Sequence, residues 1–149
     1  MLQNYLPSVI ENTNEKLAEI IVADNGSTDN SLSVLKKDFS NLRVIELKKN
    51  FGFAEGYNRA LEQCNHAYFV LLNSDVEVTP GWLDPLISNL ENNYRIAAAQ
   101  PKIKSWVNKE MFEYAGASGG YIDQYGYPFC RGRVINVVEK DRGQYDEPA

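Results

Sequence analysis

The residues with the clearest chemical potential are Asn73 and Asp75, which directly follow an apolar run at residues 67–72. Such a run is typical of a buried parallel strand, and α/β folds place ligands just beyond the carboxyl ends of these strands. A carboxylate at that position can hold Mg²⁺ or Mn²⁺ against a diphosphate, sharing the cation with diphosphate oxygens and waters. A polar strand end that leads into a helix explains the same residues, and for a lone Asn-x-Asp this alternative is the stronger one.

A second candidate is Asp24, which follows a β-branched apolar run at residues 19–23 and opens the polar loop 24–29. Gly26 permits a turn, and residues 27–29 suit the cap of a following helix, a role that we accept for them. Asp24 lies ahead of this cap, and its carboxylate can accept the N3–H of a uracil or thymine. A role in the turn is the alternative, and residue type alone favours it.

A third loop, residues 50–58, is rich in glycine but does not match the G-x-G-x-x-G dinucleotide fingerprint. Glycines such as Gly52 allow a ligand to approach the backbone closely, and free amides at the start of the following helix can meet a phosphate. An ordinary tight turn, with Asn50 and Asn58 as local caps, explains the loop equally well.

A different composition appears in residues 114–132, where glycines alternate with aromatic residues. The segment is predicted to be loop or hairpin, and its rings either fill the underside of a hairpin or offer a stacking platform for sugars or bases. Arg131 and Arg133 can reach a diphosphate in principle, but a structural role is favoured for both.

The elements that must position these residues alternate along the chain. Helices are predicted at residues 2–13, 31–39, 54–64 and 80–92, the last capped by Thr79, and strands at 19–23, 42–47, 68–72, 95–103 and 133–138. This order predicts an α/β fold, with a mostly parallel sheet covered by helices on both faces. The polar residues 140–149 are expected to fray.

Composition narrows the function classes. The chain has 149 residues, 44% of them hydrophobic, which fits one domain, and its net charge of −5 without a Lys/Arg cluster argues against a nucleic-acid partner. Cys64 and Cys130 form no CxxC pair, which favours a reducing compartment, and a single histidine excludes a His-rich metal site. No apolar run approaches the length of a membrane span, and no leader is evident.

Taken together, the three loops carry a resemblance. In this order and spacing, the segments IIVADNGSTDNS, KNFGFAEGYNRAL and FVLLNSDVEVTPGWLDPLI resemble the family-two glycosyltransferases. The nearest branch resembles the rhamnosyltransferase-type enzymes of bacterial surface-polysaccharide assembly. The resemblance is strong over residues 2–104, and FEYAGASGGYIDQYGYPFCRGR is similar to the next segment of that branch.

The resemblance implies a GT-A fold with a Rossmann-like nucleotide-binding half. Asp24 matches the family aspartate that contacts the pyrimidine base, and Asn50 and Gly52 match the loop beside the nucleoside. Asn73 and Asp75 occupy the D-x-D position, with Asp75 as the ligand of Mg²⁺ or Mn²⁺. Asparagine in the first slot is usual in the branch, but it removes one charge and should weaken metal affinity in the absence of nucleotide.

The implied reaction is inverting transfer of a sugar, rhamnose being one candidate, from a UDP- or dTDP-sugar donor to a polysaccharide, other glycan or lipid-linked acceptor. A base deprotonates the acceptor hydroxyl, and the metal neutralises the departing diphosphate. The implied location is the cytoplasm, free or peripheral at the inner membrane face. A non-catalytic nucleotide- or glycan-binding or assembly module on the same fold is the alternative.

Two departures from the family pattern lead to further expectations. The family's first, central strand would precede Met1, and its catalytic acidic residue would lie beyond Ala149. We therefore expect one truncated domain at residues 1–149, with a nucleotide-sugar-binding part at 1–104 and the start of an acceptor-side segment at 105–149. This fragment should bind nucleotide weakly and be inactive alone. The strands at 19–23 and 68–72 should pair directly, or another chain should fill the gap, so self-association is expected.

Overall fold

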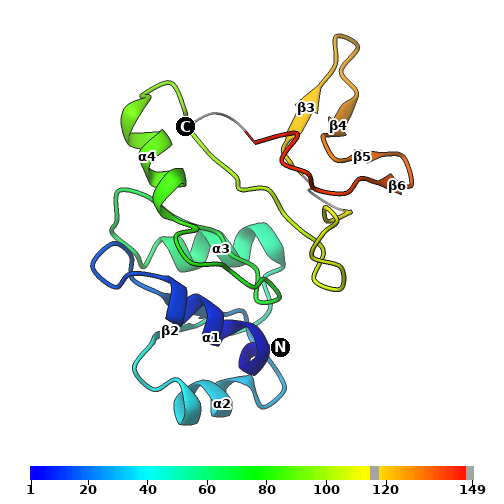
Figure 1. The fold of residues 1–149 in the computed structure, drawn as a ribbon. Coiled ribbons are helices and arrows are strands. Elements are labelled where there is room, and N and C mark those ends of the chain that lie inside the picture. The colour runs from blue at the N-terminus through cyan, green and yellow to red at the C-terminus, as the bar shows by residue number, and fades with distance from the viewer. Residues whose placement is uncertain (115–117, 147–149) are drawn as a thin grey trace. The chain divides into compact units, whose positions relative to one another are not determined.

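The computed structural model describes residues 1–114 and 118–146. The chain divides into two compact units, Met1–Pro80 and Gly81–Ala149, which are described separately below (Figure 1). The expected single domain with an internal boundary near residue 104 stays a prediction. None of the helices in the described ranges is long and apolar enough to cross a membrane.

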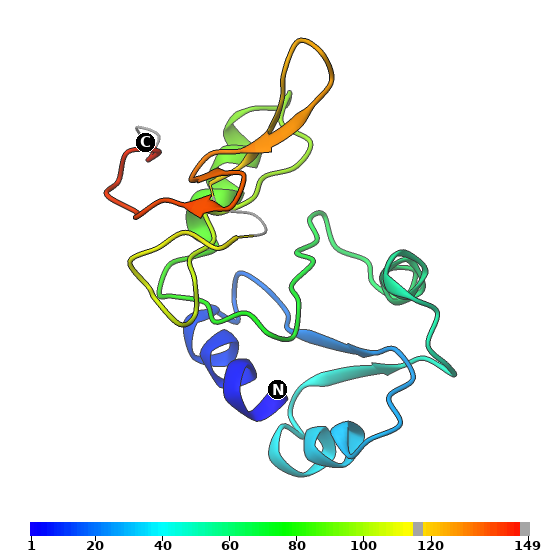
Figure 2. The same ribbon diagram turned by 90° about the vertical axis from the view of Figure 1, so that its right-hand side faces the viewer.

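The first unit confirms the predicted alternation of helices and strands up to residue 64. Its elements are α1 (Leu2–Asn12), β1 (Ile21–Asp24), α2 (Ser31–Asp38), β2 (Arg43–Glu46) and α3 (Phe53–Leu61). β1 and β2 run side by side and pair in parallel, with Ile21 opposite Arg43 and Asp24 opposite Glu46 (Figure 2). Both strands therefore end at the same edge of the pair. Loop 24–29 begins at the end of β1, and loop 50–58 follows shortly after the end of β2.

The core of this unit is built from one face of each element. Leu6 and Val9 lie three residues apart on α1 and are buried, as the helical period requires. Leu35 of α2 is 1% exposed and Ile45 of β2 is 5% exposed, so the centre of the core lies between a helix and the parallel pair. Ala60 buries the inner face of α3.

The predicted buried strand at residues 68–72 is wrong. The segment forms no strand, and the exposed fraction rises from 43% at Tyr68 to 55% at Leu71. The expected direct pairing with β1 is also absent, since β1 pairs only with β2 among the described residues. A strand is stable only when a neighbour completes its backbone hydrogen bonds, so an apolar sequence alone does not create one.

The second unit begins with a helix that starts later than predicted. α4 spans Asp84–Asn92, so neither Thr79 nor Pro80 begins it. The reason lies in Gly81, whose φ of +70° is left-handed and interrupts any helix that would start before it. The second proline, Pro85, instead takes the early helical position that suits a residue without an amide hydrogen.

The predicted strand at residues 95–103 is also wrong, because this segment has no ladder partner among the described residues. Its middle, residues 97–99, is three alanines, which favour strands weakly and bury little area. The next β pairing after this segment consists of single antiparallel bridges, one between Lys104 and Phe112 and one between Met111 and Lys140.

The glycine- and tyrosine-rich segment forms the predicted hairpin. β3 (Gly120–Ile122) pairs antiparallel with β4 (Pro128–Cys130), and Tyr121 stacks on Phe129 with ring centres 5.6 Å apart. The part of the prediction at Gly116 lies outside the described residues. The strand predicted at 133–138 is a second hairpin, β5 (Arg133–Val134) and β6 (Val137–Val138), because Ile135 turns the chain with a φ of +53°.

The tail does not fray over the residues that the structure describes, 140–146, so that expectation is wrong there. Asp141 has a buried side chain that forms ion pairs of 3.1 Å with both Lys102 and Lys104. Burial acts to raise the pKa of Asp141, but the amide of Gly143 and the two lysines outweigh it and lower the pKa to about 2. Composition could not reveal these partners, because they lie almost forty residues upstream.

Candidate functional site

Asp24 closes the turn that follows β1. Its side chain is buried, and the Oδ2 atom accepts a hydrogen bond of 3.1 Å from the amide of Ser27. Its carbonyl oxygen accepts a further bond of 2.9 Å from the amide of Leu47, which ties the end of β1 to the end of β2. The structural alternative for Asp24 is therefore present, and its contact with a pyrimidine base stays a prediction.

The next residue, Asn25, joins the first loop to the second, and our sequence analysis did not single it out. Its Oδ1 atom accepts a hydrogen bond of 3.0 Å from the amide of Phe51. Its Nδ2 group donates to the carbonyl of Gly52 at 2.8 Å and to Oδ1 of Asn50 at 3.3 Å. The only signal in the sequence is an Asn-Gly pair in a loop, and that pair by itself indicates just a turn.

Two glycines allow the loops to approach each other at main-chain distance. Gly26 has a φ of +73°, and a Cβ atom there would lie 2.4 Å from the carbonyl carbon of Lys49. Gly56 is buried in α3, and a Cβ atom there would lie 2.7 Å from Nδ2 of Asn25. The close approach predicted for the glycines of loop 50–58 was that of a ligand, and it stays a prediction; at Gly56 the space is taken by the Asn25 side chain, while Gly26 permits the turn as expected.

Asn50 and Gly52 form the turn that enters α3. Oδ1 of Asn50 accepts a bond of 2.7 Å from the amide of Gly52, which is the local role foreseen as the alternative. Gly52 is the N-cap of α3, with a φ of +79°, and its open side has no atom within 4 Å of a Cβ position. A helix start with space in front of it can receive an anionic group.

The third loop is exposed, and the side chain of Tyr57 on α3 reaches it. The hydroxyl of Tyr57 lies 3.3 Å from the carbonyl oxygen of Leu72 and 3.4 Å from Oδ1 of Asn73. Burial raises the pKa of the Tyr57 phenol, so the hydroxyl keeps its proton and acts as a donor. Asp75 is exposed and makes no hydrogen bond or ion pair within the described ranges.

The donor set limits what kind of metal site this region can form. Among the described residues, no three His, Cys, Asp or Glu side chains gather as a metal site. Asp75 offers one accessible carboxylate, and the side-chain oxygen of Asn73 faces the Tyr57 hydroxyl. Such a set fits a cation that is shared with the oxygens of a bound diphosphate, and it does not fit a cage made by protein alone.

The structure therefore brings together part of the predicted site. Asp24, Asn50 and Gly52 lie on two loops that Asn25 locks together. Asn73 is linked to the same helix by Tyr57, while no hydrogen bond or ion pair within the described ranges joins Asp75 to these residues. Each of these side chains belongs to the first unit.

Arg131 and Arg133 have structural partners, which agrees with the structural role favoured for both. Nε of Arg131 donates to the carbonyl of Ser118 at 2.9 Å, and its guanidinium lies 5.0 Å from the ring centre of Tyr121. Arg133 donates to the carbonyl of Tyr114 at 2.7 Å and lies 4.2 Å from that ring centre.

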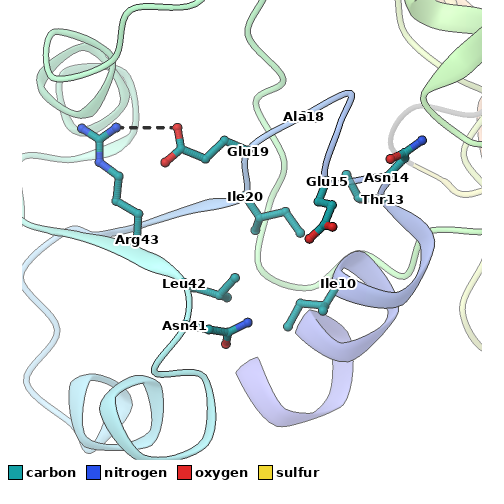
Figure 3. Close-up of a pocket in the computed structure, with 10 residues that line it drawn as sticks. All are labelled: Ile10, Thr13, Asn14, Glu15, Ala18, Glu19, Ile20, Asn41, Leu42 and Arg43. Atoms are coloured by element: carbon teal, nitrogen blue, oxygen red, sulfur yellow. Dashed lines mark ion pairs between the residues drawn. The ribbon is translucent and has the colours of Figure 1, made fainter.

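A pocket of about 610 Å³ lies elsewhere in the first unit (Figure 3). Ile20 and Arg43, at the amino ends of β1 and β2, are among its lining residues, and an ion pair of 3.7 Å joins Arg43 to Glu19. None of the predicted site residues lines it. The pocket is at the end of the strands opposite to the loops, so it is not the candidate site.

Comparisons with known proteins identify the family. The model of glycosyl transferase family 2 matches residues 1–138. A protein from Haemophilus influenzae named as an uncharacterized glycosyltransferase is 34% identical over 108 residues, which is 70% of this chain and 33% of that protein. The N-acetylglucosaminyl-diphospho-decaprenol L-rhamnosyltransferase of Mycobacterium tuberculosis is 26% identical over 69% of this chain and 37% of that enzyme.

A third relative, the undecaprenyl-phosphate 4-deoxy-4-formamido-L-arabinose transferase of Pseudomonas fluorescens, is 29% identical over 64% of this chain and 31% of that enzyme. The chain thus spans about a third of the length of these curated relatives. No solved structure matches it significantly. Because the family model covers most of the chain, and with it all three loops, the chain belongs to glycosyl transferase family 2.

Proposed function

We propose that the chain is the nucleotide-sugar-binding part of an inverting, metal-dependent glycosyltransferase. The observation that carries the proposal is the lock between the first two loops, where Asn25 contacts Asn50 and Gly52 at the open start of α3. Loops held in this way present main-chain amides to an anionic ligand without further ordering. Family membership supports the class of reaction.

The residue roles follow the order of the loops. Asp24 accepts the N3–H of a pyrimidine base, and Asn50 and Gly52 lie beside the nucleoside. Asp75 holds Mg²⁺ or Mn²⁺ together with the donor diphosphate, and Asn73 contacts the diphosphate or the sugar. When bound, the cation neutralises the charge of the departing diphosphate. We assign no catalytic base within residues 1–149.

The donor and acceptor are proposed by class. A UDP- or dTDP-sugar is the donor, and a glycan or a lipid-linked saccharide is the acceptor. Two relatives are named for transfer involving decaprenyl diphosphate and undecaprenyl phosphate carriers, which supports a lipid-linked acceptor. This acceptor class also favours a cytoplasmic location, free or at the inner membrane face.

The parallel pair of β1 and β2 supports the finer proposal of a Rossmann-like GT-A sheet. In that arrangement a strand from another chain would pair with the exposed apolar residues 68–71 and so join them to the sheet. We propose that the isolated chain self-associates through residues 68–71 in this way. Light scattering during size-exclusion chromatography tests it, and a monomer at every concentration would contradict it.

Titration calorimetry with dTDP, or with UDP, and Mn²⁺ tests the proposed function. The wild-type chain should bind weakly and only in the presence of the metal, and it should transfer no sugar alone. Asp75→Ala should remove the metal-dependent part of the binding. Asp38→Ala is a matched control, because Asp38 is an exposed aspartate on α2, outside the three loops. Equal metal-dependent binding by Asp75→Ala and the wild type would remove Asp75 from the site.

A non-catalytic nucleotide- or glycan-binding or assembly module remains the second candidate. The exposed aromatic hairpin favours it, since Tyr125 and Tyr127 are 77% and 72% exposed and can stack on sugars. Calorimetry separates the two candidates. Glycan binding without any binding of nucleotide and metal would favour the module.

A further inference from the structure

We propose that Asn25 is a positioning residue that sets the path of the donor-binding loop and the start of α3. The inference rests on the proposed function, because it assigns to Asn25 the task of holding Asn50 and Gly52 where a nucleotide meets them. Asn25 itself is not proposed to touch the ligand.

The side chain of Asn25 does not serve its own turn. The turn after β1 is closed by Asp24, whose carboxylate accepts the amide of Ser27. The three side-chain bonds of Asn25 all reach across to residues 50–52, about twenty-five positions away. Its role is therefore tertiary and joins two loops.

The hydrogen-bond partners of Asn25 dictate the residue type at this position. The amide of Phe51 can only donate, so the atom that faces it must be an acceptor. The carbonyl of Gly52 can only accept, so the atom that faces it must be a donor. A side-chain amide meets both demands at once, whereas a carboxylate or an aliphatic side chain meets one or neither.

The contact between Asn25 and Gly52 bears directly on ligand binding. Gly52 is the N-cap of α3, so a bond to its carbonyl fixes the direction in which the first-turn amides of the helix point. Gly56, one turn later, lacks a side chain at the place where Asn25 lies, 2.7 Å from the position of a Cβ atom. The helix is thus shaped to receive Asn25, and the anion-binding amides are oriented by that contact.

Asn25→Asp is the sharpest test because it preserves the size of the side chain and replaces the Nδ2 donor by an acceptor oxygen. Its second oxygen would face the acceptors of Gly52 and Asn50, so the loop should be repelled while the carboxylate is ionised. We expect binding of dTDP with Mn²⁺ to weaken about tenfold at neutral pH, because the half-buried side chain loses its donor and its ionised oxygen faces two acceptors. The matched control is Asn41→Asp, an exposed residue at the amino end of β2.

The pH dependence distinguishes positioning from a general loss of structure. Repulsion raises the pKa of the introduced carboxyl group, and its protonated form can donate to the Gly52 carbonyl again. The affinity of Asn25→Asp relative to the wild type should therefore recover as the pH falls from about 7.5 to about 4.5, toward the ordinary aspartate pKa of about 4. Asn25→Ala has no group to titrate and should stay weak across the same range. A constant ratio for Asn25→Asp would overturn the proposal.

Gly56→Ala gives a test that does not depend on folding of the Asn25 variants. Alanine favours a helix more than glycine does, so α3 itself should not be weakened. Its methyl group would displace the side chain of Asn25, and nucleotide affinity should fall although the fold is kept, as circular dichroism can verify. Wild-type affinity in Gly56→Ala would overturn the proposal. A wild-type chain that binds no nucleotide would instead overturn the proposed function, and this inference with it.

Discussion

The hydroxyl of Tyr57 lies 3.4 Å from the amide oxygen of Asn73, and this contact joins α3 to the third loop. Because the oxygen of the Asn73 amide faces the phenol, its NH₂ group is the part that remains to meet a ligand. Asn73 is therefore better suited to donate a hydrogen bond to a sugar or phosphate oxygen than to coordinate a cation.

Tyr57→Phe should weaken binding of dTDP with Mn²⁺ by about three- to tenfold, because it removes one hydrogen-bond donor to the loop. The pKa of Tyr57 is raised by burial, so the difference from the wild type should be constant from about pH 6 to about pH 9. Calorimetry at several pH values measures both effects. Tyr94→Phe is the control, since Tyr94 is 96% exposed and should behave as the wild type. An unchanged affinity in Tyr57→Phe would show that the contact does not orient Asn73.

Gly26→Ala should destabilise the chain by about 2–4 kcal/mol, because its left-handed φ and its contact with the Lys49 backbone both oppose a side chain. Gly52→Ala is the matched control. Gly52 has a similar φ of +79° but open space around it, so only the backbone strain of about 1–2 kcal/mol applies. Urea unfolding of the two variants measures the difference. Equal losses of unfolding free energy in the two variants would mean that the two loops can move apart at Gly26 without a cost in free energy.

The ion pairs of Asp141 should make the second unit sensitive to acid. Its folded-state pKa of about 2 lies below the ordinary aspartate pKa of 3.8, so the stabilisation is fully present above pH 3.8 and is lost as the pH falls through about 2. Asp141→Asn should therefore cost about 1–2 kcal/mol at neutral pH, after allowance for screening at the half-exposed lysines, and progressively less as the pH falls toward 2.

Unfolding of this variant between neutral pH and acid tests the prediction. Asp146→Asn is the control, because Asp146 pairs with Lys102 from an exposed position and should contribute much less. A loss in Asp141→Asn that stays the same at every pH would point to packing and not to charge.

The exposed row at residues 68–71 should govern association of the isolated chain. Replacing Phe69 and Leu71 together by serine should lower self-association and the binding of apolar dyes, with little loss of stability, because both side chains are about half exposed. Light scattering measures the association. The same double change at Val134 and Val137, also exposed, is the control in the second unit. Unchanged association would place the contact elsewhere.

The sequence predicted well what is decided locally. The periodic apolar residues of α1, α2 and α3 identify these helices without knowledge of the rest of the chain, and the β-branched run before Asp24 identifies β1. The segments at 68–72 and 95–103 were predicted wrongly because a strand depends on a neighbour that the run itself does not encode.

The candidate site was predictable in position but not in its internal contacts. The glycines and polar residues of the three loops marked where ligands would bind, while the actual partners of Asn25 and Asp141 lie far away in the sequence. Such long-range pairs leave no periodic trace. In the same way, the late start of α4 depends on the backbone angle of Gly81, which glycine permits without requiring it.

The crowding at Gly26 has a consequence for engineering the chain. The atoms nearest to a Cβ atom placed at Gly26 are the carbonyl carbon and Cα of Lys49 and the backbone nitrogen of Asn50, all of them main-chain atoms, while the Lys49 ammonium extends over the ring of Phe51, 5.2 Å from its centre. The course of the main chain is thus indifferent to the side chain at position 49. Charge can be removed or reversed there with the loop left in place. Substitutions at this position can therefore change the electrostatic potential of the loop without changing its main-chain path.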